Sequence, residues 1–133
     1  MLYLEKSILF VGAGVSAVIL NLFGEWDMLI TFLLIAAVLD YFTGLIASGI
    51  EGKLSSKSGL KGIGRKVMVF SLVTVAHLID TILTNQHFIR NATIIFYLCN
   101  EMISIIENVG RAGVPVPGFL IKAVEVLKKN RSE

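Results

Sequence analysis

The chain has 133 residues, 55% of them hydrophobic and only 17% charged, and its formal net charge at pH 7 is +2. Soluble domains carry about 25% charged residues, so this composition excludes a soluble globule and predicts an integral membrane protein. The length leaves room for one membrane domain, residues 1–133.

The first hydrophobic run, residues 7–23, is just long enough for a membrane-spanning helix. Lys6 precedes it, as in a signal peptide, but no cleavage site of small residues follows, so we expect an uncleaved span. After a short acidic turn, residues 28–50 form the second predicted span, with Asp40 near its middle. Small and polar residues recur at every fourth position around Asp40, including Gly44, and make one stripe along this helix.

Residues 51–66 form the one long polar interruption, which is rich in glycine and serine and is predicted to be a loop. A short surface helix over residues 60–66 is compatible with its length. The loop contains one acidic residue, Glu51, and five basic residues: Lys53, Lys57, Lys61, Arg65 and Lys66. Because positively charged flanks resist translocation, this loop is predicted to stay in the cytoplasm and to act as a topology signal.

Two further spans are predicted at residues 67–84 and 92–109. The third carries the polar residues His77 and Asp80, one turn apart. The fourth is the most polar span, and its polar side chains are Asn100, Glu101, Ser104, Glu107 and Asn108.

Residues 117–129, which follow Pro115 and begin with Pro117, form an amphipathic helix too short to span a membrane. We expect it to lie on an anionic lipid surface. The basic residues on or just after this helix are Lys122, Lys128, Lys129 and Arg131.

The charges also predict the orientation of the spans. If residues 51–66 are cytoplasmic, both chain ends are cytoplasmic as well, and every Lys and Arg except Arg90 lies on that side. The predicted fold is therefore all-α and integral to the membrane, with four transmembrane helices, both termini inside, and a surface helix at the carboxyl end.

Asp40, Asp80 and Glu101 are the predicted intramembrane acids, and His77 is the predicted intramembrane base. Each charge near a helix centre costs about 2.5–3.5 kcal/mol on insertion scales, so these groups should face other helices or water, paired with His77 or Asn100. Four helices leave little room for a lumen within one protomer. The stripe therefore predicts a homo-oligomer and permits a pore, although a purely structural hydrogen-bonded seam remains an alternative. The predicted pore or contact residues are Asp40, Gly44, His77, Asp80, Asn100, Glu101, Ser104 and Asn108.

Catalysis finds no support in the sequence, which contains neither a nucleophile motif nor a metal-ligand pattern. Cys99 is the single cysteine and lies in a hydrophobic run, so we predict no metal, cofactor or internal disulfide. The basic residues border spans without interleaved aromatic residues, which argues against nucleic-acid binding. Apart from a pore, the alternatives are a small ion channel or transporter and a non-conducting membrane subunit that docks a cytoplasmic partner.

Several short motifs, in this order and spacing, resemble the phage holin family of the toxin-secretion and phage-lysis type. That family includes holins of phages of Gram-positive bacteria and a relative linked to export of large clostridial toxins. The similarity extends from about residue 35 to residue 127. The motifs are Asp40-Tyr41-Phe42-Thr43-Gly44, Ser55-Ser56-Lys57, the run 59–66, His77 with Asp80, Asn100-Glu101 with Ser104-Ile105 and Glu107-Asn108, and the run 113–117.

The resemblance implies a multi-pass protein of the host bacterial inner membrane that oligomerises at a set time and opens lesions. Its partners would be other copies of itself, membrane lipids and a released cargo, which is an endolysin or a toxin. Asp40, Gly44, Asp80, Glu101 and Asn108 would belong to the membrane signature of the family.

Overall fold

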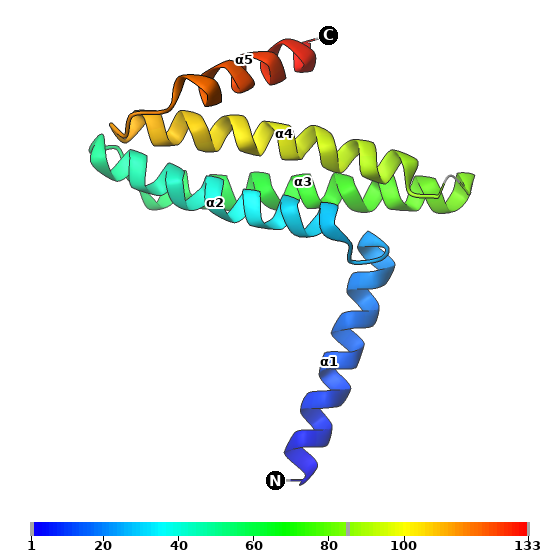
Figure 1. Ribbon diagram of the computed structural model, residues 1–133. Coiled ribbons are helices and arrows are strands. Elements are labelled where there is room, and N and C mark those ends of the chain that lie inside the picture. The colour runs from blue at the N-terminus through cyan, green and yellow to red at the C-terminus, as the bar shows by residue number, and fades with distance from the viewer. Residues whose placement is uncertain (1, 85, 133) are drawn as a thin grey trace.

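The computed structural model describes residues 2–84 and 86–132, with only the backbone for residues 130–132. All five elements of this part of the chain are helices (Figure 1). They are α1 (Leu2–Phe23), α2 (Met28–Ile50), α3 (Ser56–Leu83), α4 (Phe88–Arg111) and α5 (Gly118–Ser132). The first four are long and apolar enough to cross a membrane. The predicted all-α class with four candidate spans is thereby confirmed.

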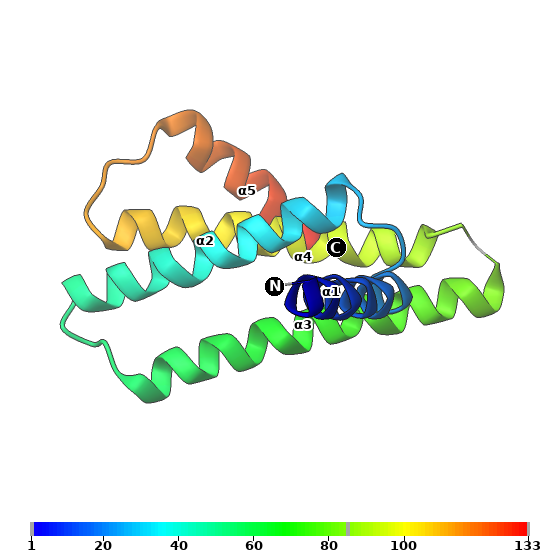
Figure 2. The same cartoon turned by 90° about the horizontal axis from the view of Figure 1, so that it is seen from below.

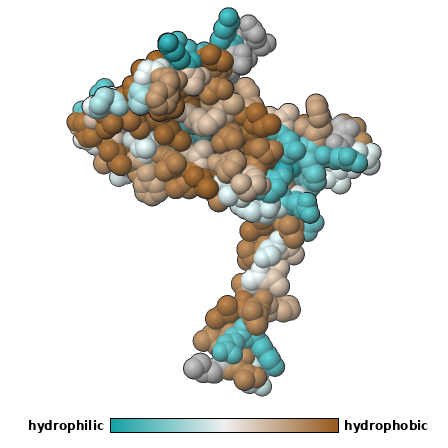
Figure 3. Space-filling view, viewed as in Figure 1, coloured by the Kyte–Doolittle hydropathy of each residue, from teal (hydrophilic) through white to brown (hydrophobic). Residues whose placement is uncertain are grey.

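Helices α2, α3 and α4 lie alongside one another as a three-helix bundle, in which α4 packs against both others (Figures 1 and 2). We call the end where α2 ends and α3 begins the basic end, and the other end, with residues 24–27, the opposite end. The hydrophobic core, Ile30, Leu33, Val73 and Ile94, lies in the half nearer the opposite end. Most other large apolar side chains point outward, and brown surface dominates Figure 3. Such a surface suits lipid as the surrounding solvent.

The predicted loop over residues 51–66 is wrong in most of its length, because α3 already begins at Ser56. Ser55 caps the helix, with its Oγ accepting a hydrogen bond from the Ser58 N–H at 3.1 Å. The glycines that suggested a loop serve helix packing instead. A Cβ atom at Gly59 would lie 3.3 Å from the Tyr41 hydroxyl of α2, and one at Gly62 would lie 3.3 Å from the Tyr41 ring, so their absence lets this side chain lie close against α3. At 28 residues, α3 is about 42 Å long and exceeds a hydrocarbon core of about 30 Å.

Helix α1 includes the predicted first span but does not join the bundle. It leaves the opposite end at a steep angle to α2, α3 and α4 (Figures 1 and 2), and none of its residues is buried. Its last turn alone reaches the bundle, where the Phe23 ring packs edge-on against Phe70 of α3. The orientation with both termini inside stays a prediction, because α1 does not run alongside the other spans here.

Helix α5 folds back over α4 (Figure 1). Val124 of its predicted apolar side is buried, whereas Phe119 remains exposed. Lys128 Nζ lies 2.6 Å from Glu107 Oε1. Glu107 thus pairs with α5, whereas Arg111 pairs with Glu51. The Arg131 side chain lies outside the described part of the chain.

Candidate functional site

Three charged residues meet inside the bundle at one depth. Asp40 of α2, Lys66 of α3 and Glu101 of α4 each lie ten residues from the end of their helix at the basic end. At 1.5 Å per residue this places all three about 15 Å from that end, which is about half the thickness of a hydrocarbon core.

Lys66 joins the two acids. Its Nζ donates hydrogen bonds to Asp40 Oδ2 and, at 2.5 Å, to Glu101 Oε2. The side chains are largely withdrawn from the surface, with exposed fractions of 21% for Lys66, 13% for Asp40 and 7% for Glu101. The predicted placement of Lys66 in a cytoplasmic loop is wrong, because the extra helical turns of α3 carry it into the bundle. His77, the predicted intramembrane base, lies further along α3 and is not a partner of this group.

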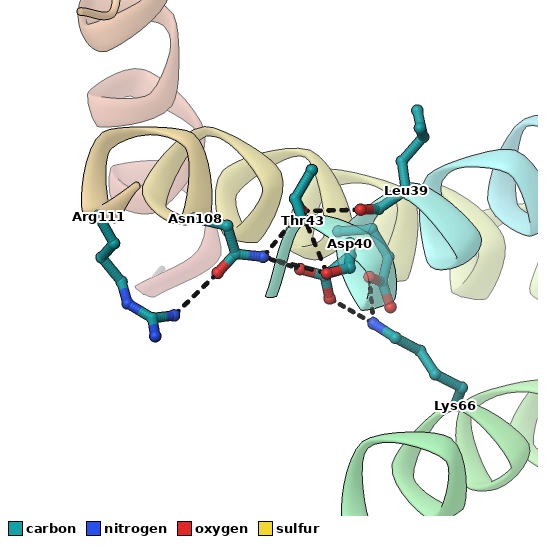
Figure 4. Close-up of polar contacts among 7 residues, drawn as sticks. Leu39, Asp40, Thr43, Lys66, Asn108 and Arg111 are labelled. Atoms are coloured by element: carbon teal, nitrogen blue, oxygen red, sulfur yellow. Dashed lines mark hydrogen bonds and ion pairs between the residues drawn. The ribbon is translucent and has the colours of Figure 1, made fainter. Parts of the chain in front are cut away.

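Asn108 of α4 extends the network toward the basic end (Figure 4). Its Nδ2 donates to Asp40 Oδ1 at 2.8 Å and lies 3.0 Å from Thr43 Oγ1. Its Oδ1 accepts a hydrogen bond from Arg111 at 3.1 Å, and Arg111 in turn pairs with Glu51 at 2.5 Å. Polar contacts therefore run without a break from mid-depth to the end of the bundle. We call the set Asp40, Lys66, Glu101, Asn108, Arg111 and Glu51 the charged network.

A cleft of about 230 Å³ lies beside the charged network. It is lined by polar groups from all three helices, including Ser48, Ser58 and Ser104, and by the exposed Arg65 near the basic end. Gly44 also lines it, and a Cβ there would lie 3.5 Å from the Asn108 amide nitrogen. The cleft is large and polar enough to hold several water molecules, and it runs beside the network toward the basic end.

The charge balance of the buried group is uneven. Two carboxyl groups, of Asp40 and Glu101, face one ammonium group, so the group carries one excess negative charge when all three are ionised. A buried ion pair is maintained only when further hydrogen bonds satisfy its members. The Asn108 amide supplies one such bond to Asp40.

Asp80 and His77 do not belong to the charged network. Asp80 lies at the opposite end, where its two carboxyl oxygens accept the backbone N–H groups of Ile89 at 2.9 Å and Arg90 at 2.7 Å. It thus caps the amino terminus of α4, where the helix dipole favours negative charge. His77 stacks on His87 with ring centroids 6.0 Å apart. Asn100 is half-buried on α4, one residue from Glu101.

Arg90 is a buried residue that the sequence analysis left outside the site. Its side chain is fully buried and its Nε donates to the Phe23 carbonyl at 2.5 Å. One terminal nitrogen reaches the Glu25 carbonyl at 2.9 Å, and the other pairs with Asp27 at 2.9 Å. Burial works against ionisation of Asp27, but hydrogen bonds from Arg90 and the Ile30 N–H outweigh it and hold the pKa of that carboxyl below its usual range. Arg90 therefore clamps the turn between α1 and α2 onto α4.

The remaining predicted basic residues lie on the surface. Lys53, Lys57, Lys61 and Arg65 are exposed around the basic end, and Lys122, Lys128 and Lys129 are exposed on α5. Among the residues that the structure describes, no group of three His, Cys, Asp or Glu side chains gathers as metal ligands would.

Comparison with known proteins decides the family. The model of the bacteriophage holin family matches residues 17–129, which contain the whole bundle and most of α5. This chain is a member of the bacteriophage holin family. The resemblance seen in the sequence is thereby confirmed, and membership together with the four apolar helices makes it a multi-pass protein of the bacterial inner membrane.

Relatives of this holin-family chain occur in bacteria and in a phage. It is 34% identical over 112 residues to a probable holin of Bacillus phage phi105, with 84% of this chain and 82% of the relative covered. An uncharacterized protein of Halalkalibacterium halodurans is 44% identical over 126 residues, covering 91% and 93%. One of Clostridium perfringens is 39% identical over 112 residues, covering 84% and 83%. No solved structure matches the chain.

Proposed function

We propose that this protein acts as a holin that oligomerises in the cytoplasmic membrane and opens lesions, with the charged network as the switch between closed and open packing. The lesions release an endolysin to the cell wall or a toxin from the cell. Membership of the bacteriophage holin family and the similarity to a probable phage holin support this function. The observation that carries the switch is the buried group of Asp40, Lys66 and Glu101 at mid-depth.

The closed protomer satisfies its polar groups internally. Asp40, Glu101 and Asn108, which on sequence grounds were expected to need other copies of the chain, find partners within one protomer. A single protomer can therefore diffuse through lipid without exposing its central charges. Since a charge facing lipid is costly, the helices stay together until an alternative exists in which these groups face water.

Assembly supplies that alternative. When several bundles meet, α2 and α4 can turn so that Asp40, Glu101 and Asn108 face a shared aqueous space, where water replaces their internal partners. The polar cleft at the basic end gives water a starting point for this rearrangement. The result is a two-packing switch in which polar groups exchange partners while the apolar faces remain in lipid.

Two other functions stay open for the test. A small ion channel would use the same network without opening a protein-sized lesion. A docking subunit would use the exposed basic residues at the basic end and conduct nothing. Membership of the holin family suggests a non-enzymatic protein, and the proposed switch requires no chemical step.

The deciding experiment is controlled expression in a bacterium that lacks any endolysin. Membrane potential and release of a large cytoplasmic enzyme are followed together, because they separate lesions of different size. Abrupt depolarisation with enzyme release after a silent lag is the expected result. Depolarisation with the enzyme retained would indicate a small channel. An intact potential at high protein level would overturn the proposed function.

A further inference from the structure

Helix α1 lacks a partner within its own chain. It is 22 residues long, none of its residues is buried, and its apolar side chains are widely exposed, with Phe10 at 82%. It is apolar around most of its circumference, unlike a helix made for a membrane surface. A transmembrane helix of this kind gains stability by packing against other helices.

The bundle in turn lacks its fourth helix. Helices α2 and α3 both pack on α4 but hardly touch each other, and Figure 2 shows them splayed. Between them runs an apolar furrow of about 650 Å³, lined along α2 by Leu34, Val38 and Phe42 and along α3 by Ile63, Val67 and Phe70. We call it the α2/α3 furrow. It lies where a four-helix bundle would place its remaining helix.

Two observations connect α1 with this furrow. Leu22 and Phe23, the last residues of α1, already line its end. Lys66 lines both this furrow and the polar cleft, and 21% of its side chain is exposed. A helix in the furrow would therefore also cover the lipid-facing side of the charged network.

We propose that α1 is an exchangeable fourth helix, which in the assembled state occupies the α2/α3 furrow of a second copy of this chain. This inference rests on the proposed function in one respect, because it names the contact through which the protein would assemble.

The turn after α1 keeps this helix out of the protomer's own furrow in the single chain. Arg90 holds the carbonyls of Phe23 and Glu25 in the arrangement that directs α1 away from the bundle and its furrow (Figure 1). Crossing the same bilayer as the bundle requires α1 to swing toward the bundle axis, with Gly24, at a φ of 76°, as a suitable pivot. Once upright, α1 would meet the same side chains in either furrow, so exchange is promoted by a high density of protomers. Density is also the natural trigger for a protein that accumulates before it acts.

Cysteine cross-linking between separately expressed chains tests the exchange. Val11 and Ser71 both lie 12 residues from the ends of α1 and α3 at the opposite end, so α1 docked antiparallel to α2 would bring them to one depth. One tagged chain carries Val11→Cys and a differently tagged chain carries Ser71→Cys, both with Cys99→Ala. Ser71 lines the furrow, whereas its neighbour Leu72 lines the cleft on the α4 side of α3, so Leu72→Cys is the matched control.

After treatment of membranes with a short bis-maleimide, we expect several-fold more cross-linked heterodimer with Ser71→Cys than with Leu72→Cys, rising steeply with expression level. Equal yields would overturn the proposal. So would a cross-link that forms only within one chain carrying both Val11→Cys and Ser71→Cys. If a variant fails to accumulate, Val15→Cys with Thr74→Cys replaces the pair.

The same cells report on the proposed function separately. Lesions without the α1-to-furrow cross-link would overturn the exchange and leave the holin function intact. The cross-link without depolarisation or enzyme release would overturn the lesion function and leave the exchange intact.

Discussion

Replacing Lys66 with methionine removes the base that Asp40 and Glu101 share at mid-depth. Methionine has a similar length and no charge, so the change leaves the packing volume nearly intact. Breaking a buried ion pair by removing one partner costs about 3–5 kcal/mol. Because 1.36 kcal/mol corresponds to a factor of ten, the balance between closed and open protomers should shift at least about a hundred-fold. We therefore expect Lys66→Met to open lesions markedly earlier than the unaltered chain at equal protein level.

The assay follows membrane potential after induction, with protein level measured by immunoblot. Lys61→Met is the matched control, since Lys61 lies on the exposed side of the same helix five residues earlier and should leave the onset unchanged. A triple variant with Lys66→Met, Asp40→Leu and Glu101→Leu separates two explanations. Replacing a whole buried ionic group with apolar residues is often neutral for stability. The triple variant also has no charged groups at mid-depth that would gain from facing water. Its depolarisation should therefore begin late or not at all. An unchanged onset in Lys66→Met, or an early onset in the triple variant, would refute the switch.

Three further predictions concern Arg90, Asp27 and helix α5. Arg90→Met should lower the free energy of unfolding in detergent by about 3–5 kcal/mol and expose the 24–27 turn to protease. The control Arg65→Met, at an exposed position, should do neither. Equal protease protection of the turn in the two variants would contradict the role of Arg90 in holding it. Because the pKa of Asp27 is lower in the folded protein than its ordinary value of 3.8, its ionised form adds to the stability of the fold. This stabilisation is fully present above pH 3.8 and is lost as the pH falls through the lower pKa of the folded state. The melting temperature should therefore drop less on acidification in Asp27→Asn than in the unaltered chain, and parallel profiles would count against this assignment. Anionic lipid should contribute about 1 kcal/mol to membrane binding of α5 for each basic residue near the surface. Replacing four basic residues of α5 with alanine should therefore shift the time of lysis. An unchanged time would mean that α5 plays no part in setting the onset. The four positions are Lys122, Lys128, Lys129 and Arg131.

The sequence was sufficient to predict the spans, because hydrophobic runs of 17–23 residues bounded by turns and charges have few alternatives in a membrane. It also singled out Asp40, Glu101 and Asn108, since polar side chains inside such runs need partners. The structure brings these three into one network.

The partner of the two acids could not be predicted in the same way. Lys66 ends a run, residues 51–66, with four glycines and three serines, a composition that indicates a loop by local propensity. Packing of the Tyr41 ring against Gly59 and Gly62 overrides that propensity, and such a contact between two helices leaves no mark on the local pattern. The role of Asp80 was equally hidden, because it depends on the place where the following helix begins.

The core of the bundle and its polar cleft occupy different halves of the molecule. The cleft and the charged network fill the half at the basic end, while Ile30, Leu33, Val73 and Ile94 close the half at the opposite end. Under the proposed function, and in the language of ion conduction, this protomer would act as a half-channel, open to water at the basic end and closed by a hydrophobic gate at the other. The barrier to leakage before triggering would then reside in these four aliphatic side chains. We would expect polar substitutions among them, rather than in the charged network, to make a resting protomer conduct.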